Sequence, residues 1–223
     1  MRPSKPASVL LSLVLALLVL SFSISVPILF RPFYYVQIDA LHLPEQTGWS
    51  AEVIREAYDE VLDFCVFGAP FGTGELAWSE SGRSHFADVR GLFLADFAVL
   101  GVTAAAAAGF LLLYKAKGLR FHRFAGRGPA FWAGTGAAAA VLVVAGLAAL
   151  DFDRAFVVFH AIFFPGKDNW IFDPAADQII LVMPEVFFRN CALLIGGVLL
   201  ACCAGLVLWD VLARRRSRTA ALR

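Results

Sequence analysis

Two of the four histidines stand where acid–base chemistry is feasible. His85 comes just before a long hydrophobic segment, and Asp88 follows it three residues later, on the same face of a helix. His160 lies between two other hydrophobic segments, in a loop that also carries carboxylates. Imidazole exchanges protons near neutral pH and ligates metals, so two histidines that meet would indicate acid–base catalysis or metal binding. His42 and His122 are interpreted as surface residues.

Motifs for several other kinds of catalysis are missing from the sequence. It holds no G-x-S-x-G, H-E-x-x-H or P-loop pattern. Ser84 is adjacent to His85, but neighbours on a helix do not face each other, so a Ser–His nucleophile pair is not expected. Two histidines with nearby carboxylates are a minimal metal-ligand set, although the usual i, i+4 pairing is missing. Acid–base and metal-dependent chemistry both stay open.

The composition predicts that these residues sit in a membrane protein. Hydrophobic residues make up 60% of the 223 residues and charged residues only 17%, and the mean hydropathy is +0.73. A soluble domain is closer to half apolar and a quarter charged, so there is too little polar surface here to cover a soluble globule. The formal net charge of +1 gives no reason to expect a nucleic-acid partner.

Four segments have the length and apolar character of membrane-spanning helices, which need about 20 residues. They are residues 8–30, 91–114, 129–150 and 186–212. The first resembles a signal peptide, but it is long and no small-residue cleavage site follows it, so we interpret it as a retained anchor. The sequence therefore predicts an all-α membrane protein that forms one integral membrane domain over residues 1–223.

The distribution of charge predicts the orientation of the four spans. Twelve of the nineteen Lys and Arg residues lie in the N-terminus, in the segment between spans two and three, and in the C-terminus. The other two connections, residues 31–90 and 151–185, hold sixteen of the eighteen acidic residues. Positive loops stay in the cytoplasm, so both termini are expected inside and these two structured loops outside.

The outer loops contain further helix signals. Residues after Ser50 repeat apolar positions with a period near 3.6 as far as Phe67, with acidic residues on the opposite face, which predicts an amphipathic helix at the outer interface. Ser84 is expected to cap the helix that leads into the second span. Pro184 suits the first turn of the last helix.

Small residues recur at four-residue spacing in two of the spans and are expected to form helix-packing faces. They are Gly101, Ala105 and Gly109, and Gly197, Ala201 and Gly205.

Other polar or reactive residues carry weaker signals. Asp96 lies within the second span, where an ionisable group needs a partner or water. Cys65 and Cys191 are both expected near the outer face, where a disulfide could join them if the geometry allows. Cys202 and Cys203 fall inside the last span and are interpreted as buried small residues.

Two segments of the outer loops resemble a known family. They are Ser-His85-Phe-Ala-Asp-Val, and Phe-His160-Ala-Ile-Phe-Phe continued through Asn-Trp-Ile-Phe-Asp-Pro-Ala-Ala-Asp177; the later Pro184-Glu-Val-Phe-Phe also fits. The chain is similar here to the four-span bacterial membrane proteins that include the lipoprotein intramolecular transacylase. The predicted topology agrees over nearly the whole chain, although its spans are unusually rich in alanine.

The resemblance implies a reaction and a place for it. The substrate would be a diacylglyceryl-modified lipoprotein in the outer leaflet of the bacterial cytoplasmic membrane. Its sn-2 acyl chain would move to the free amine of its N-terminal cysteine, with no cofactor or metal. The two histidines of the family map onto His85 and His160, with one acting as base and the other as its partner.

The same resemblance suggests supporting residues. Asp88 is expected to orient His85, and Asp173 to orient His160. Asn169 and Trp170 are expected to place the glyceryl group, and Glu185 to belong to the same site. Independently of the resemblance, spacing on a helix is expected to put Phe156, Phe159 and Phe163 around His160.

Two alternatives from other classes remain. One is a metal-dependent membrane hydrolase that uses the two histidines and nearby aspartates. The other is a non-enzymatic scaffold or accessory protein, for which the acidic face of the amphipathic helix would be a docking surface.

Overall fold

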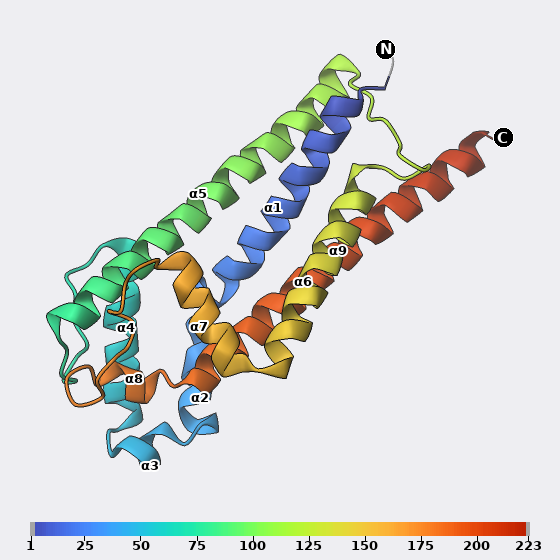
Figure 1. The fold of residues 1–223 in the computed structure, drawn as a ribbon. Coiled ribbons are helices and arrows are strands. Elements are labelled where there is room, and N and C mark those ends of the chain that lie inside the picture. The colour runs from blue at the N-terminus through green and yellow to red at the C-terminus, as the bar shows by residue number, and fades with distance from the viewer. Residues whose placement is uncertain (1–2, 222–223) are drawn as a thin grey trace. The chain divides into compact units, whose positions relative to one another are not determined.

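The computed structural model describes residues 3–221, and their side chains as far as residue 215. Helices account for all the regular structure in this range, without a β-strand (Figure 1). In chain order they are α1 (Lys5–Leu29), α2 (Pro32–Ala40), α3 (Leu43–Thr47), α4 (Ala51–Phe67), α5 (Glu80–Lys117), α6 (Pro129–Leu150), α7 (Phe152–Phe163), α8 (Ile179–Val182) and α9 (Glu185–Ala221).

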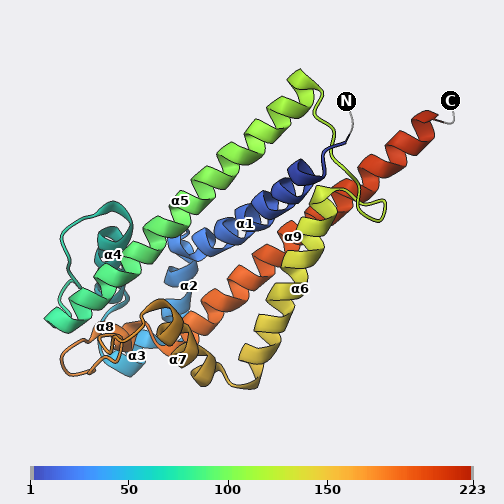
Figure 2. The same ribbon diagram turned by 45° about the horizontal axis from the view of Figure 1, so that its top comes forward.

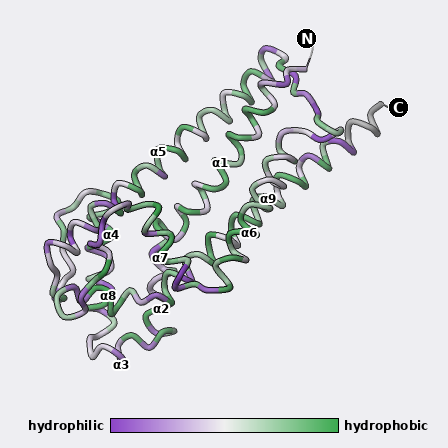
Figure 3. Tube along the Cα trace, viewed as in Figure 1, coloured by the Kyte–Doolittle hydropathy of each residue, from purple (hydrophilic) through white to green (hydrophobic). Residues whose placement is uncertain are grey.

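Four of these helices are long and apolar enough to cross a membrane. They are α1, α5, α6 and α9, the last as far as Arg215, and apolar residues follow most of their length (Figure 3). The four predicted spans coincide with these helices. The second span differs most, because α5 extends eleven residues before the predicted start at residue 91.

The helix leading into the second span begins earlier than predicted. Ser84 was expected to cap it, but α5 starts at Glu80 and the capping side chain is that of Ser79, whose Oγ accepts from the Gly82 N–H at 3.0 Å. Asp177 fixes Ser79 by accepting from its N–H at 2.8 Å and its hydroxyl at 2.7 Å. The prediction failed because a residue almost a hundred positions away selects the cap.

The chain divides into two compact units, and the first contains Met1–Ile24, Phe97–Gly146 and Ile195–Arg223. Its buried centre is formed by Val19, Leu199 and Cys203. In this unit α6 packs against α9 (Figure 2), where Gly134 lies so close that an added Cβ would be 2.7 Å from the Cys203 carbonyl oxygen. Burial of Cys203 confirms the interpretation of that residue.

The small-residue faces predicted in the second and fourth spans do not form the close contact between α6 and α9. Nothing outside the helix backbone lies within 4 Å of a Cβ built on Gly101, Gly109, Gly197 or Gly205. Close approach occurs at Gly134 instead. Four-residue spacing of small residues permits helices to approach, but it does not determine which face meets a neighbour.

Polar contacts within the first unit join the three basic segments. The Ser4 N–H donates to the Arg120 carbonyl at 2.9 Å, and the His122 N–H donates to Ser8 Oγ at 2.6 Å. The Gly128 N–H donates to Asp210 Oδ1 at 3.0 Å. The segment between α5 and α6 is thereby tied to the start of α1 and to the last part of α9, as expected if all three lie on one side of a membrane.

The second unit contains Ser25–Asp96 and Leu147–Leu194. The predicted amphipathic helix is α4, and Ser50 caps it by accepting from the Val53 N–H at 3.4 Å. Its apolar face is buried, and Tyr58 stacks on Tyr34 of α2 at 3.8 Å between ring centroids. The hydrophobic period thus predicted both the helix and the face that is buried. This face packs against other residues of the chain.

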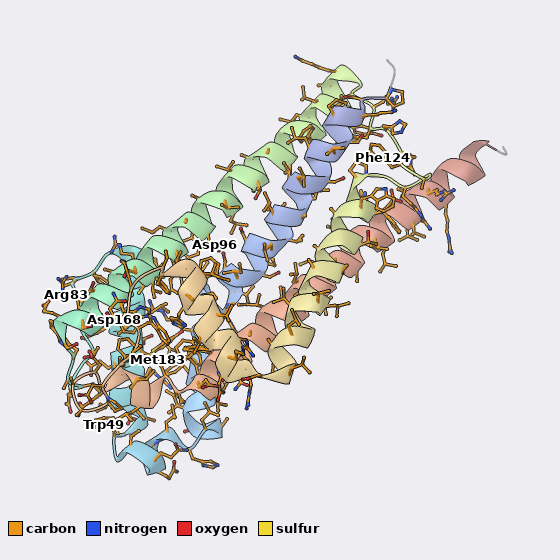
Figure 4. The ribbon with its side chains drawn as sticks, in the orientation of Figure 1. Trp49, Arg83, Asp96, Phe124, Asp168 and Met183 are labelled. Atoms are coloured by element: carbon orange, nitrogen blue, oxygen red, sulfur yellow. The ribbon has the colours of Figure 1, made fainter. Side chains whose placement is uncertain are left out.

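Two further expectations concern this unit. Cys65 and Cys191 are both free, so the disulfide considered from the sequence is not formed. Asp96, labelled on α5 in Figure 4, accepts a hydrogen bond from Ser25 Oγ at 2.9 Å, which supplies the partner that its depth requires. Pro184 directly precedes α9, which begins at Glu185.

Candidate active site

The two predicted histidines come together within the second unit. His85 lies in the second turn of α5, and His160 lies near the end of α7, whose first turn is capped by Asp151 accepting from the Arg154 N–H at 2.9 Å. Their ring centroids are 5.8 Å apart, and the planes differ by 31°. Each histidine is only 6% exposed. A pair of buried imidazoles at this distance can act on the same small group.

Aromatic rings enclose both histidines. The His85 ring meets Phe164 and Phe172 edge-on, with centroids at 5.0 and 5.4 Å. The His160 ring stacks on Trp170 at 4.4 Å and lies 4.3 Å from Phe156. These rings keep bulk water from the imidazoles, which strengthens every electrostatic interaction in the site.

One hydrogen bond determines the protonation pattern of His160. Its Nδ1 lies 2.8 Å from the carbonyl oxygen of Phe156, one helical turn earlier. A carbonyl only accepts, so Nδ1 carries the proton and Nε2 has the free lone pair. Burial lowers the pKa of His160 below its ordinary value of 6.5, and the bond to the Phe156 carbonyl opposes part of this shift. At neutral pH this ring is therefore an uncharged base.

Asp88 and Asn169 meet beside His85. Asp88 accepts from Lys167 Nζ and, at 3.0 Å, from Asn169 Nδ2, which also approaches Ser84 Oγ at 3.4 Å. Lys167 and Asn169 belong to the loop after α7, the loop that carries Asp168, which is labelled in Figure 4. The contacts fasten this loop to α5. Asp88 also acts on His85 through its charge, and that it orients this imidazole stays a prediction.

Trp170 and two carboxylates complete the set of predicted residues. Trp170 contacts His160 directly, and its Nε1–H donates to the Lys167 carbonyl at 3.1 Å. Asp173 accepts from the Ala175 N–H at 3.0 Å and closes a turn, and no hydrogen bond joins it to His160 within the described chain. Glu185 lies at the start of α9 beside Asp153. The structure thus does not bring Asp173 or Glu185 to the imidazoles.

Three residues of the site were not singled out from the sequence. Phe164 and Phe172 contact His85, and Lys167 pairs with Asp88. Of the three phenylalanines expected around His160, Phe156 and Phe159 contact its ring, whereas Phe163 packs on Phe159. The richness of the loop in aromatic residues was a signal for such a wall, but it does not tell which rings face inward.

The arrangement offers few ligands for a metal ion. Among residues 3–215, no three His, Cys, Asp or Glu side chains are grouped so that they could hold one. Ser84 interacts with Asn169, and no hydrogen bond joins it to His85 in this range. What the site does present is a basic nitrogen on His160, a second imidazole whose ring centroid lies 5.8 Å from that of His160, and an apolar lining.

Comparisons with known proteins agree with this fold. The family model described as "Lipoprotein intramolecular transacylase Lit" matches residues 9–188. The fold is similar to a structure of the membrane-integral lipoprotein intramolecular transacylase Lit from Bacillus cereus, with a TM-score of 0.81 and 24% identity over 94% of this chain and 96% of that one. No curated protein sequence matched.

A structure of the same Bacillus cereus protein with a histidine mutated to arginine is also similar, with a TM-score of 0.75 and 24% identity over 95% of this chain and 93% of that one.

Proposed function

This chain belongs to the lipoprotein intramolecular transacylase family and is a membrane acyltransferase, and we propose that it transfers the sn-2 acyl chain of a diacylglyceryl lipoprotein to the amine of the lipoprotein's own N-terminal cysteine. The observation that carries the proposal is the buried pair of His85 and His160. Lipoprotein and membrane lipid are the partners of this reaction, and no cofactor takes part.

The reaction needs little more than a base, an acid and correct placement. The cysteine nitrogen attacks the sn-2 ester carbonyl and loses a proton, the carbonyl carbon–oxygen bond to glycerol breaks, and the glyceryl oxygen takes up a proton. An amide and a free hydroxyl result. The α-amine has a pKa of about 7.7–8.0, so a modest base is sufficient. Because the attack occurs within one molecule, no covalent enzyme intermediate is required.

The two imidazoles suit these steps. His160 has its lone pair on Nε2 and takes the proton from the attacking amine. His85 is the partner that stabilises the oxyanion or protonates the departing glyceryl oxygen. The aromatic rings around both histidines suit an acyl chain and a lipid backbone, with Trp170 next to the base.

The proposal also places the site on the outer side of the bacterial cytoplasmic membrane. The charge distribution along the chain supports both termini inside, and the second unit, which holds the histidines, contains the connections that are rich in acidic residues. A lipoprotein anchored in the outer leaflet would then present its glyceryl group at the level of the two rings.

Mass spectrometry of a lipoprotein's N-terminal peptide tests the proposal. Bacterial cells that lack lipoprotein N-acylation are compared with and without this protein. We expect the free-amine diacyl form to become the N-acyl lyso form, and His85→Ala or His160→Ala to abolish the change, because general acid–base groups contribute about 10²- to 10⁴-fold to rates.

A matched control uses another histidine. His42 is exposed and has a φ of 52°, which asparagine tolerates, so His42→Asn keeps the fold and should leave acyl transfer intact. Unchanged conversion in either alanine variant of the site, at equal expression, would refute the assignment of the two histidines.

A further inference from the structure

Two buried side-chain atoms of the second unit have no hydrogen-bond partner among the described residues, and they belong to residues of the site. They are Nδ1 of His85 and Oδ1 of Asn169, both buried. The two side chains interact with each other, and a buried polar atom that is left without a partner destabilises the folded protein. A small adjustment that lets one atom donate to the other satisfies both. The question is which of them carries the proton.

The chemistry of Asp88 answers this question. The Lys167 ammonium contacts Asp88 and keeps it as a carboxylate, which can only accept hydrogen bonds. Asn169 must therefore direct its NH₂ group toward Asp88, where Nδ2 lies 3.0 Å from Oδ2. The amide oxygen is then the atom left for His85. An amide oxygen only accepts, so the proton must be on Nδ1 of His85.

We propose that Asn169 is a positioning residue that, held by Asp88, fixes the protonation pattern of the His85 ring. The proton remains on Nδ1 in both the neutral and the charged ring, so every proton that His85 exchanges passes through Nε2. His160 is held in the same pattern by the Phe156 carbonyl. Both rings then use the same nitrogen, although a side chain orients one and the backbone orients the other.

This role differs from the one expected from the sequence, in which Asn169 placed the glyceryl group. Its effect on rate rests on the proposed function, whereas the protonation pattern itself needs no substrate. Lys167 and Asp88 act on His85 through Asn169. The Lys167 ammonium keeps Asp88 ionised, the Asp88 carboxylate orients the Asn169 amide, and this amide orients the His85 imidazole.

Nitrogen NMR of protein labelled with ¹⁵N-histidine tests the inference. The spectrum is recorded at a pH well above the ordinary histidine pKa, and the His85 signals are identified by their loss in His85→Gln. We expect a protonated Nδ1 and an unprotonated Nε2. A proton found on Nε2 of His85 in the unaltered protein would overturn the proposal.

Two variants and a control extend the test. Asp88→Asn can donate to the Asn169 oxygen and so lets the amide turn its NH₂ toward His85, and Asn169→Leu removes the acceptor. Both should shift the His85 proton toward Nε2 and slow acyl transfer by about tenfold or more. Glu80→Gln makes the same chemical change as Asp88→Asn at an exposed position of α5 and should alter neither result.

The possible results separate this inference from the proposed function. Asn169→Leu reports on the amide if Asp88→Asn does not fold, and an unchanged His85 pattern in a folded variant of either kind refutes the role of Asn169. Absence of acyl transfer in the unaltered protein would instead refute the proposed function, while the NMR result would still decide how the ring is oriented.

Discussion

The environment of His160 predicts how the rate of acyl transfer depends on pH. Burial lowers its pKa below 6.5, so at pH 7 the ring is neutral and Nε2 can accept a proton. As the pH falls through the lowered pKa, the ring becomes protonated and the base is lost. We expect the rate of acyl transfer to fall on the acid side with a midpoint below 6.5, separate from titration of the substrate amine near about 7.7–8.0.

Trp170→Ala provides the comparison for this pH profile. Removing the ring stacked on His160 at 4.4 Å lets water reach the imidazole, which reduces the desolvation that lowers the pKa. The acid-side midpoint should therefore move up toward 6.5. The profile is measured with purified protein and a synthetic diacylglyceryl lipopeptide. The base role of His160 would be contradicted if the unaltered protein showed, apart from the midpoint of the substrate amine, an acid-side midpoint above 6.5.

Chelation tests the alternative of a metal-dependent hydrolase. The acid–base reaction uses groups of the protein and the substrate only, so we expect EDTA to leave the rate of acyl transfer unchanged. The assay is the same lipopeptide conversion, with and without chelator. Loss of activity that returns on adding a divalent metal would favour the hydrolase class instead.

The sequence predicted the histidines better than their partners. His85 and His160 could be predicted because each lies at the end of an apolar segment on the same expected membrane side. The hydrogen bond from Asn169 to Asp88 could not be predicted, because the path of the loop after α7 depends on distant contacts such as Gln178 N–H to the Ala77 carbonyl at 3.0 Å. Asp173 is near His160 in sequence, but its carboxylate accepts a hydrogen bond from the Ala175 N–H within its own turn.

At the scale of elements, the contact between α6 and α9 depends on Gly134. Alanine there would place a Cβ 2.7 Å from the Cys203 carbonyl oxygen and 3.1 Å from Cγ2 of Val207. A backbone oxygen cannot rotate away, so the helices must shift, at a cost of about 1–3 kcal/mol. We expect Gly134→Ala to lower the thermal unfolding temperature in detergent.

Gly197→Ala is the matched control for this change. It alters a glycine of α9 in the same way, but a Cβ on Gly197 has nothing within 4 Å. Its unfolding temperature should stay unchanged or rise slightly, because alanine favours the helix. Equal losses in both variants would mean that the close approach at Gly134 does not matter.

Helices could be predicted from local patterns, but their contacts could not. The period of α4 gave its bounds and its buried face, since every turn repeats the same information. The sequence does not tell which glycine lies at a helix contact, because Gly134 and Gly197 both lie inside apolar spans. They differ only in whether a neighbouring helix lies against them. The start of α5 was missed for the same reason, because Asp177 fixes the cap at Ser79.

At the scale of the whole molecule, similarity of fold extends much further than identity of sequence. The chain aligns over 94% of its length with the Bacillus cereus structure at a TM-score of 0.81, although only 24% of residues are identical. In a membrane, many apolar residues satisfy the lipid-facing positions equally well. Large differences in the spans, including their alanine content here, are therefore compatible with one arrangement of helices.

The orientation of the molecule is the remaining expectation that can be tested directly. If the positive segments are inside, Lys117 faces the cytoplasm and the exposed Glu45 of the first outer loop faces outward. The four native cysteines are first replaced by serine or alanine, and then Glu45→Cys or Lys117→Cys is introduced. We expect a membrane-impermeant maleimide to label the first variant in intact spheroplasts and the second only after permeabilisation. The reverse pattern would place the two histidines on the cytoplasmic side, where a lipoprotein in the outer leaflet could not reach them.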